Sequence, residues 1–190
     1  MTQALLVVDA QNEFSARGLR AVPNHAEAMD VILARIDEAR VAGNPIAFVQ
    51  HFNKPDESRA FVPGSWGAQL SPGVGTKPGF GPERLFTKDV FGAFTETGLE
   101  DWLASIGVDE VLIVGFFAHM CVSTSAREAL VRGFNVRVDA RGVGARDLED
   151  ELLGRQSADE VRRSALLQLS DMGVMIEHRE ALAAVATEAA

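Results

Sequence analysis

Short runs of apolar and β-branched residues alternate along this chain with segments of helical periodicity. Strand-like runs are predicted at 4–10, 45–51, 83–88, 110–116, 134–140 and 174–178. Segments with apolar residues at helical spacing predict helices at 24–43, 99–107, 121–132 and 157–173. Strands that alternate with helices in this way form parallel sheets, because each strand needs a crossover to return to the same edge.

This alternation predicts an α/β fold, a three-layer α/β/α sandwich around a Rossmann-like, mainly parallel sheet of six strands. The 190 residues suit one domain spanning 1–190. In such sheets, ligands bind beyond the carboxyl ends of the strands. We therefore look for functional side chains at that edge.

Charge and cysteine content limit the partners and the compartment. The formal net charge is −9 and the arginines form no basic stripe, which argues against nucleic acid or an anionic membrane as a partner. The sequence has no long apolar run of membrane-spanning length and no signal-peptide pattern at its start. A single cysteine allows no internal disulfide, so we expect a cytoplasmic protein.

Three segments fall outside the alternation. Residues 52–82 are rich in Gly and Pro and are long for a simple connection, and Phe61, Trp66 and Phe80 within them predict an ordered lid. Residues 140–151 are interpreted as a turn that leads into a helix. Residues 180–190 are alanine-rich and predict a short helix that packs at an interface or frays.

Three strand ends carry groups that can do chemistry together. Asp9 follows the first strand, Lys88 ends the third, and Cys121 comes shortly after the fourth. Parallel strands end at one edge of the sheet, so we expect these groups to meet there. A helix start and a nearby ammonium favour a thiolate, and a carboxylate can carry its proton. The set suits acyl transfer through a thioester.

Each of these residues also has an ordinary structural explanation. A lone cysteine is often an inert buried residue, an Asp at a strand end is often a cap, and a lone Lys is usually solvated. Their coincidence at one edge of the sheet favours the catalytic interpretation over three separate accidents.

Four blocks of the sequence resemble the isochorismatase-like cysteine hydrolases. They are "LLVVDAQNEF", "FVPGSWGAQLSP", "FTKDVFGAF" and "VGFFAHMCVSTSAREALVRGFNVRVDA", and the resemblance runs from about residue 4 to 147. It implies a catalytic triad of Asp9, Lys88 and Cys121. It also implies a cis peptide bond between Phe116 and Phe117, and an oxyanion hole formed by the backbone N–H groups of Phe117 and Cys121.

The resemblance also bears on metal binding. Metal-dependent nicotinamidases of this superfamily carry an Asp-x-His pair just after the second strand, where this chain has His51 and Asn53. One imidazole and one amide make a poor divalent site, so no metal and no other cofactor is expected. His51 is instead expected on the pocket wall or as a packed histidine.

Further pocket residues follow from position in these blocks. Phe14 lies within the Asp-x-Gln-x-x-Phe pattern that begins at Asp9, and Trp66 has a ring and an N–H that suit a small polar ligand. Phe116 and His119 flank the nucleophile. These residues are candidates for the substrate pocket, with simple packing as the alternative for each.

The leading hypothesis is a metal-independent cysteine hydrolase that cleaves a C–N bond of a small amide, ureide or carbamoyl compound. One alternative is a vinyl-ether hydrolase of the isochorismatase type, with Asp9 as general acid. Its dianionic substrate would need cations, for which Arg17, Arg20 and Arg59 are candidates by loop position. Another alternative is a non-catalytic small-molecule-binding protein. The resemblance further implies a homodimer or homotetramer.

Overall fold

A parallel sheet of six strands, in the order β3-β2-β1-β4-β5-β8, forms the centre of the molecule. The computed structural model describes residues 2–54 and 56–182. The strands are β1 (Gln3–Val8), β2 (Ile46–His51), β3 (Glu83–Lys88), β4 (Glu110–Phe116), β5 (Asn135–Gly144) and β8 (Met175–Glu177). The predicted α/β fold with a six-stranded parallel sheet is confirmed.

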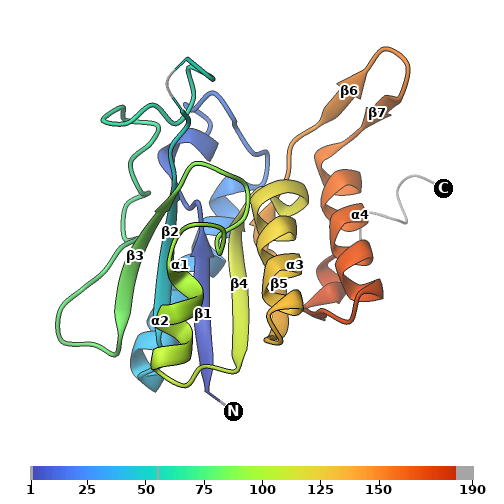
Figure 1. Cartoon of the computed structure of the whole chain (residues 1–190). Helices are drawn as coiled ribbons and strands as arrows, with labels where there is room; N and C mark the ends of the chain where they lie inside the picture. The colour runs from blue at the N-terminus through green and yellow to red at the C-terminus, as the bar shows by residue number, and fades with distance from the viewer. Residues whose placement is uncertain (1, 55, 183–190) are drawn as a thin grey trace.

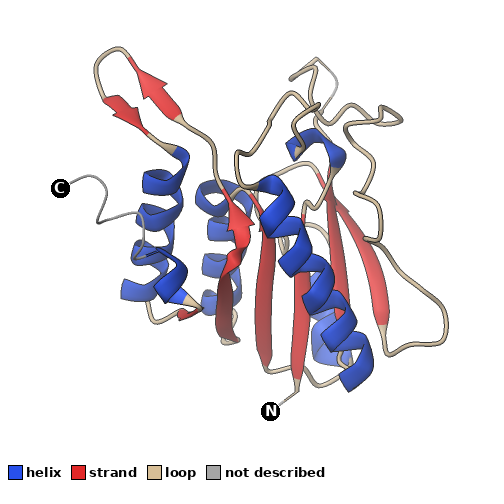
Figure 2. Ribbon diagram, turned by 180° about the vertical axis from the view of Figure 1, so that it is seen from behind, coloured by secondary structure: helices blue, strands red, loops and turns tan. Residues whose placement is uncertain are grey.

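Helices cover both faces of this sheet and make two separate hydrophobic cores. They are α1 (His25–Ala42), α2 (Leu99–Ser105), α3 (Ser123–Val131) and α4 (Ala158–Asp171). Helix α1 packs Ile32 and Ile36 on one face, and α2, α3 and α4 pack on the other, as Figures 1 and 2 show from opposite sides. Buried on both sides, β1 and β4 read as nearly continuous apolar runs.

The direction in which successive strands are added to the sheet reverses between β1 and β4. Successive connections lead from β1 outward through β2 to β3, and then from β4 outward through β5 to β8. A crevice opens beyond the carboxyl ends of two strands where such a reversal occurs. Asp9 and the turn after β4 both lie at this point.

Gly115 allows the two central strands to approach each other closely. Its φ is +127°, and a Cβ atom there would overlap the carbonyl oxygen of Val8 on β1. The register between β4 and β5 also shifts between Ile113 and Gly115. Only glycine fits this position without displacing backbone.

The segment at 140–151 differs from its interpretation as a turn that leads into a helix. Strand β5 continues to Gly144, and a two-stranded hairpin follows, β6 (Leu148–Asp150) and β7 (Gly154–Gln156), which projects beyond the rest of the molecule (Figure 1). The Asp150 carboxylate accepts the backbone N–H groups of Leu152 and Leu153, each at 2.9 Å, and so shapes the turn. Strands of three residues are too short to produce a recognisable alternation.

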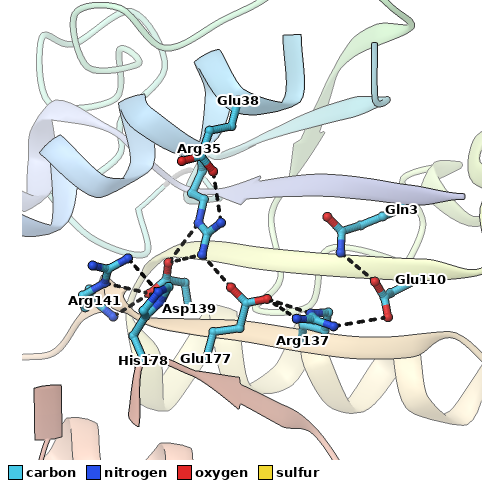
Figure 3. Close-up of polar contacts among 9 residues, drawn as sticks. All are labelled: Gln3, Arg35, Glu38, Glu110, Arg137, Asp139, Arg141, Glu177 and His178. Carbon is cyan, nitrogen blue, oxygen red and sulfur yellow. Dashed lines mark hydrogen bonds and ion pairs between the residues drawn. The ribbon is translucent and has the colours of Figure 1, made fainter. Parts of the chain in front are cut away.

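An ionic network ties α1 to the β5–β8 edge of the sheet (Figure 3). Arg35 donates to Asp139 at 2.7 Å and to Glu177 at 2.5 Å. Asp139, Glu177 and His178 together offer ligand-type atoms within 4.8 Å of one another. Because the Arg35 guanidinium already occupies both carboxylates, this cluster joins elements of the fold and does not resemble a free cation site.

The end of the described chain forms the short helix η3 (Arg179–Leu182). The rest of the helix expected at 180–190 lies outside the described residues. Within 2–54 and 56–182, no helix combines the length and the apolar character needed to cross a bilayer.

Candidate active site

The carboxyl ends of four neighbouring strands bring the candidate residues together. Lys88 ends β3, His51 ends β2, Asp9 follows β1, and Cys121 lies in the π-helical turn η2 (Ala118–Val122) after β4. Lys88 Nζ lies 2.8 Å from Asp9 Oδ2 and 3.3 Å from Cys121 Sγ. Residues more than a hundred positions apart therefore form one contact group.

Lys88 is the centre of this group and its side chain is fully buried. Besides Asp9 and Cys121, its ammonium donates to the carbonyl oxygen of Val90 at 3.1 Å. Burial acts to lower the pKa of Lys88, but the Asp9 carboxylate and the Cys121 sulfur outweigh it and leave that pKa raised. The ammonium therefore stays charged beside the sulfur.

Asp9 is held in an uncommon backbone conformation at the end of β1. Its φ is +54°, in the left-handed region that Asp tolerates better than most residues. Its N–H donates to Val49 on β2 at 2.9 Å, and its carbonyl accepts the N–H of Gln11 at 2.7 Å. The tight turn directs the buried carboxylate toward Lys88 instead of along the strand.

Cys121 is buried, and burial sets the state of its thiol. Burial and the neighbouring Asp9 carboxylate raise the pKa of Cys121, and the Lys88 ammonium only partly offsets them. The lysine does favour a thiolate, as expected, but its effect is smaller than the combined effect of burial and Asp9. The raised pKa favours a protonated thiol at rest, with the Asp9 carboxylate beside it.

A second hydrogen-bonded chain holds Lys88 from the other side. His51 Nδ1 lies 3.3 Å from Lys88 Nζ, and His51 Nε2 lies 2.8 Å from Asn53 Oδ1. An ammonium can only donate, so Nδ1 accepts and Nε2 carries the proton. The Asn53 amide nitrogen donates to the carbonyl of Ala60 at 2.8 Å, which fixes the orientation of that amide.

Gln11 fixes the backbone of His51. Its side-chain oxygen accepts the N–H of His51 at 2.8 Å, and its nitrogen donates to the carbonyls of His51 at 2.9 Å and Ala68 at 2.7 Å. The fully buried amide thus joins the ends of β1 and β2 to the long loop. It belongs to the support of the site and not to its lining.

The turn before Cys121 contains the candidate oxyanion donors. The peptide bond between Phe116 and Phe117 is cis. The carbonyl of Phe117 accepts the N–H groups of Met120 and Val122, each at 3.1 Å, and the Cys121 carbonyl accepts the hydroxyl of Ser125 at 2.6 Å. The backbone that would carry the two proposed donors, Phe117 and Cys121, is therefore held in place on both sides.

A cavity of about 250 Å³ opens over Asp9 and Cys121. Of the residues proposed for the pocket, Phe14 and His51 line it, and so does Phe117. The remaining lining residues are Arg20, Asn53, Glu57, Ser58, Phe61, Phe91, Met120 and Arg146. The long segment 52–82 supplies four of them, in agreement with its interpretation as an ordered loop over the site.

Three proposed pocket residues lie outside the lining of this cavity. The Trp66 ring is 42% exposed and packs under the Arg17 guanidinium, 4.8 Å from the ring centre. Phe116 is fully buried between Phe14 and His25, with ring centres at 5.2 and 5.4 Å. Both side chains are used for packing instead.

His119, the third of them, packs on Phe117 with ring centres 5.1 Å apart. Burial and the nearby Arg146 charge lower the pKa of His119 to about 4, so its imidazole is neutral at ordinary pH. Its ring supports the cavity wall from behind and does not form part of the lining.

The comparison with known proteins agrees with this geometry. A family model described as "Isochorismatase domain" matches residues 3–162. A secreted isochorismatase effector of Verticillium dahliae is 30% identical over 93% of this chain and 88% of its own length. Nicotinamidase 3 of Arabidopsis thaliana is 33% identical over 70% of this chain and 68% of its own. Since one relative is secreted, a cytoplasmic location stays a prediction.

Solved structures share the fold over nearly the whole chain. An isochorismatase from Pseudomonas putida superposes with a TM-score of 0.84 at 26% identity, over 92% of this chain and 87% of that one. An N-carbamoylsarcosine amidase from Thermoplasma acidophilum superposes with a TM-score of 0.76 at 25% identity, over 93% and 95%. Together with the family match over residues 3–162, these findings show that the chain belongs to the isochorismatase family of hydrolases.

Proposed function

We propose that this chain is a metal-independent cysteine hydrolase that cleaves a C–N bond of a small amide, ureide or carbamoyl compound. The observation that carries the proposal is the position of Lys88 Nζ, 2.8 Å from the Asp9 carboxylate and 3.3 Å from the Cys121 sulfur. All three side chains are buried at the base of one open cavity or directly behind it.

The first half of the reaction transfers the acyl group to sulfur. Asp9 takes the thiol proton while Cys121 Sγ attacks the carbonyl carbon, so the thiolate never has to accumulate. The Lys88 ammonium stabilises the negative charge that develops on sulfur. The oxyanion is proposed to accept the N–H groups of Phe117 and Cys121. Asp9 then gives its proton to the leaving nitrogen, the C–N bond breaks, and a thioester remains.

The second half regenerates the thiol. Asp9, again ionised, takes a proton from a water molecule whose oxygen attacks the thioester carbon. The carbon–sulfur bond breaks, the carboxylic or carbamic acid departs, and the sulfur recovers the proton from Asp9. One water is consumed for each C–N bond cleaved.

The donor set near the cavity does not fit a divalent metal. Both ring nitrogens of His51 are engaged, Nε2 with Asn53 at 2.8 Å and Nδ1 with Lys88 at 3.3 Å. A cation there would also face the buried Lys88 ammonium, which repels it. No step of the proposed reaction therefore passes through a metal.

Two of the similar proteins support C–N cleavage. A nicotinamidase and an N-carbamoylsarcosine amidase are both named for the cleavage of such bonds, and both align with most of this chain. The raised pKa of Cys121 also agrees with a mechanism in which a neighbouring carboxylate takes the proton during attack.

Ammonia release from a panel of small amides, ureides and carbamoyl compounds tests the proposal. We expect Cys121→Ala to lose turnover by at least a thousandfold on the best substrate, with unchanged circular dichroism, since removing a nucleophile abolishes covalent catalysis. Cys121→Ser should lose nearly as much, because its hydroxyl is a weaker acid. Turnover by Cys121→Ala at the wild-type rate would overturn the proposal.

Two other functions give different results once a vinyl ether is included among the compounds and its hydrolysis is measured beside ammonia release. A vinyl-ether hydrolase with Asp9 as general acid predicts that Asp9→Ala is far more damaging than Cys121→Ala. A non-catalytic binding protein predicts that no compound is turned over and that neither variant differs from the wild type. Whether any compound is turned over, and which of the two variants loses more activity, therefore separates all three functions.

A further inference from the structure

Two arginine side chains at the cavity have no role in the proposed catalytic steps. Arg20 lies in the loop after η1 (Asn12–Phe14) and Arg146 lies just beyond β5, yet both line the cavity that holds Asp9 and Cys121. Two segments more than a hundred residues apart in the sequence thus each place one positive charge at the same cavity.

Both guanidinium groups have spare hydrogen-bonding capacity. Within the described part of the chain, Arg20 makes one long side-chain contact, 3.5 Å to Ser58 Oγ, and Arg146 donates to the carbonyl of Asp147 at 3.2 Å. Arg146 Nε is buried without a hydrogen-bond partner. A buried guanidinium N–H without an acceptor is costly, which indicates that an acceptor binds there.

The acidic groups of the cavity do not neutralise these arginines. Asp9 is paired with Lys88 at 2.8 Å. Glu57, the other carboxylate in the lining, accepts the backbone N–H of Lys54 at 3.1 Å, and within the described residues it forms no ion pair with Arg20 or Arg146. The chain as a whole carries a formal charge of −9, so a cavity with two unpaired arginines departs from the character of the rest of the molecule.

We propose that the cavity selects substrates that carry a carboxylate, which Arg20 and Arg146 bind while the scissile carbonyl faces Cys121. This inference rests on the proposed hydrolase function and adds the substrate class to it. A guanidinium offers parallel N–H donors that match the two oxygens of a carboxylate. The substrates are thus small amido, ureido or carbamoyl acids.

The walls of the cavity strengthen this selection. Phe14 packs against Phe61 and Phe117, with ring centres at 5.3 and 4.8 Å, and the Arg146 guanidinium lies 5.9 Å from the Phe117 ring centre. These rings give the cavity an apolar wall, and charge interactions are stronger next to apolar groups than in open water. A volume of about 250 Å³ limits the site to small compounds.

The single cysteine permits a test that needs no substrate. Iodoacetate and iodoacetamide have nearly the same shape, differ by one negative charge, and both alkylate a thiolate with loss of iodide. All labelling reports on Cys121, because the chain has no other cysteine. The measured quantity is the rate ratio of iodoacetate to iodoacetamide, divided by the same ratio for free cysteine at the same pH.

We expect this normalised ratio to be about tenfold above one, the effect of a charge-assisted hydrogen bond. Arg20→Gln and Arg146→Gln should each lower it severalfold, and Arg146→Lys should retain part of it. Arg84→Gln is the matched control, since it removes one positive charge from the exposed side of β3 and should leave the ratio unchanged.

Two results would overturn the inference. One is a normalised ratio near one in the wild type. The other is a raised ratio that survives both Arg20→Gln and Arg146→Gln in folded protein, because Lys88 alone would then attract the anion. Alkylation does not require turnover. Neither result therefore decides the Cys121→Ala test of the hydrolase function.

Discussion

At the scale of single residues, the state of the Cys121 thiol decides how the site works. Burial and Asp9 hold the pKa of this thiol above its ordinary value, while Lys88 pulls it down. This direction supports the proposal that the reactive form is made during attack, and we expect the resting thiol to react slowly with oxidants and alkylating reagents. The sequence indicated that Asp9 can take the thiol proton, but it did not show that burial outweighs the effect of Lys88 on the Cys121 pKa.

Titration of the thiolate by its ultraviolet absorbance measures this balance directly. In the wild type we expect the thiolate to appear only above the ordinary cysteine range of about 8.5. Asp9→Asn removes a negative neighbour and should move the titration to lower pH. Lys88→Met removes the positive one and should move it higher.

The two variants serve as controls for each other, because both remove one buried charge next to the same sulfur. Movement in the same direction would show that loss of structure, and not charge, causes the change. A wild-type thiol that is ionised at neutral pH would contradict the proposed role of Asp9.

The tautomer of His51 is a second property that the contacts determine. Lys88 donates to Nδ1, so the proton resides on Nε2 and points to Asn53. We expect nitrogen NMR of the His51 ring to show protonation at Nε2. Asn53→Leu should lose this preference and lower kcat roughly tenfold, the effect of losing about 1.4 kcal/mol with one supporting hydrogen bond.

The other histidines of the chain give the reference signals for this measurement, and they should not change in Asn53→Leu, with the exception of any that contact the long loop. Protonation of His51 at Nδ1 in the wild type would contradict the assignment, because that ring could not then accept from Lys88.

Prediction from sequence succeeded for residues whose position follows from strand ends. Asp9, Lys88 and Cys121 lie together because parallel strands end at one edge, and the pattern alone indicated this. Arg146 was missed because it follows an extension of β5 that the sequence pattern does not mark. Trp66 was expected at the cavity from its chemistry, but its direction depends on the path of a loop with no periodicity.

At the scale of elements, the close contact of β1 and β4 shapes the site. Gly115 permits this contact, since any side chain there would overlap Val8. The sequence indicated a strand at 110–116 but gave no sign that its penultimate residue has a φ of +127°. The requirement comes from a neighbouring strand and is visible only in the tertiary structure.

Replacing Gly115 by alanine should therefore destabilise the protein by about 3 kcal/mol or more, because both overlap and backbone strain oppose it. Gly43→Ala at the end of α1 is the matched control, with a φ of +71° but open space around the position. We expect that variant to lose only about 1 kcal/mol. Chemical denaturation of both variants measures the difference, and equal losses would contradict the account.

The β6–β7 hairpin illustrates the opposite limit of sequence reasoning. Its strands have three residues each, and their pattern cannot be distinguished from a turn. The Asp147 carboxylate accepts the N–H of Ala158, the first residue of α4, at 2.9 Å, while Ser157 is the N-cap of that helix. The expected helix therefore begins only after the hairpin, whose projection the sequence did not indicate.

At the scale of the whole molecule, charge is unevenly distributed. The chain carries a formal charge of −9, yet the lysine and two arginines at the cavity leave that region cationic. Long-range attraction of an anionic substrate to such a site is weakened by salt. A homodimer or homotetramer stays a prediction of the family resemblance, and sedimentation of the full chain would measure it.

In the proposed reaction, Cys121 carries the acyl group between the two halves. The most direct measurement is the mass of the intact protein after acid quench during turnover of the best substrate from the ammonia-release panel. We predict a species heavier by the acyl group, with the added mass located on Cys121. Steady turnover in which Cys121 remains unmodified at every quench time would contradict the account.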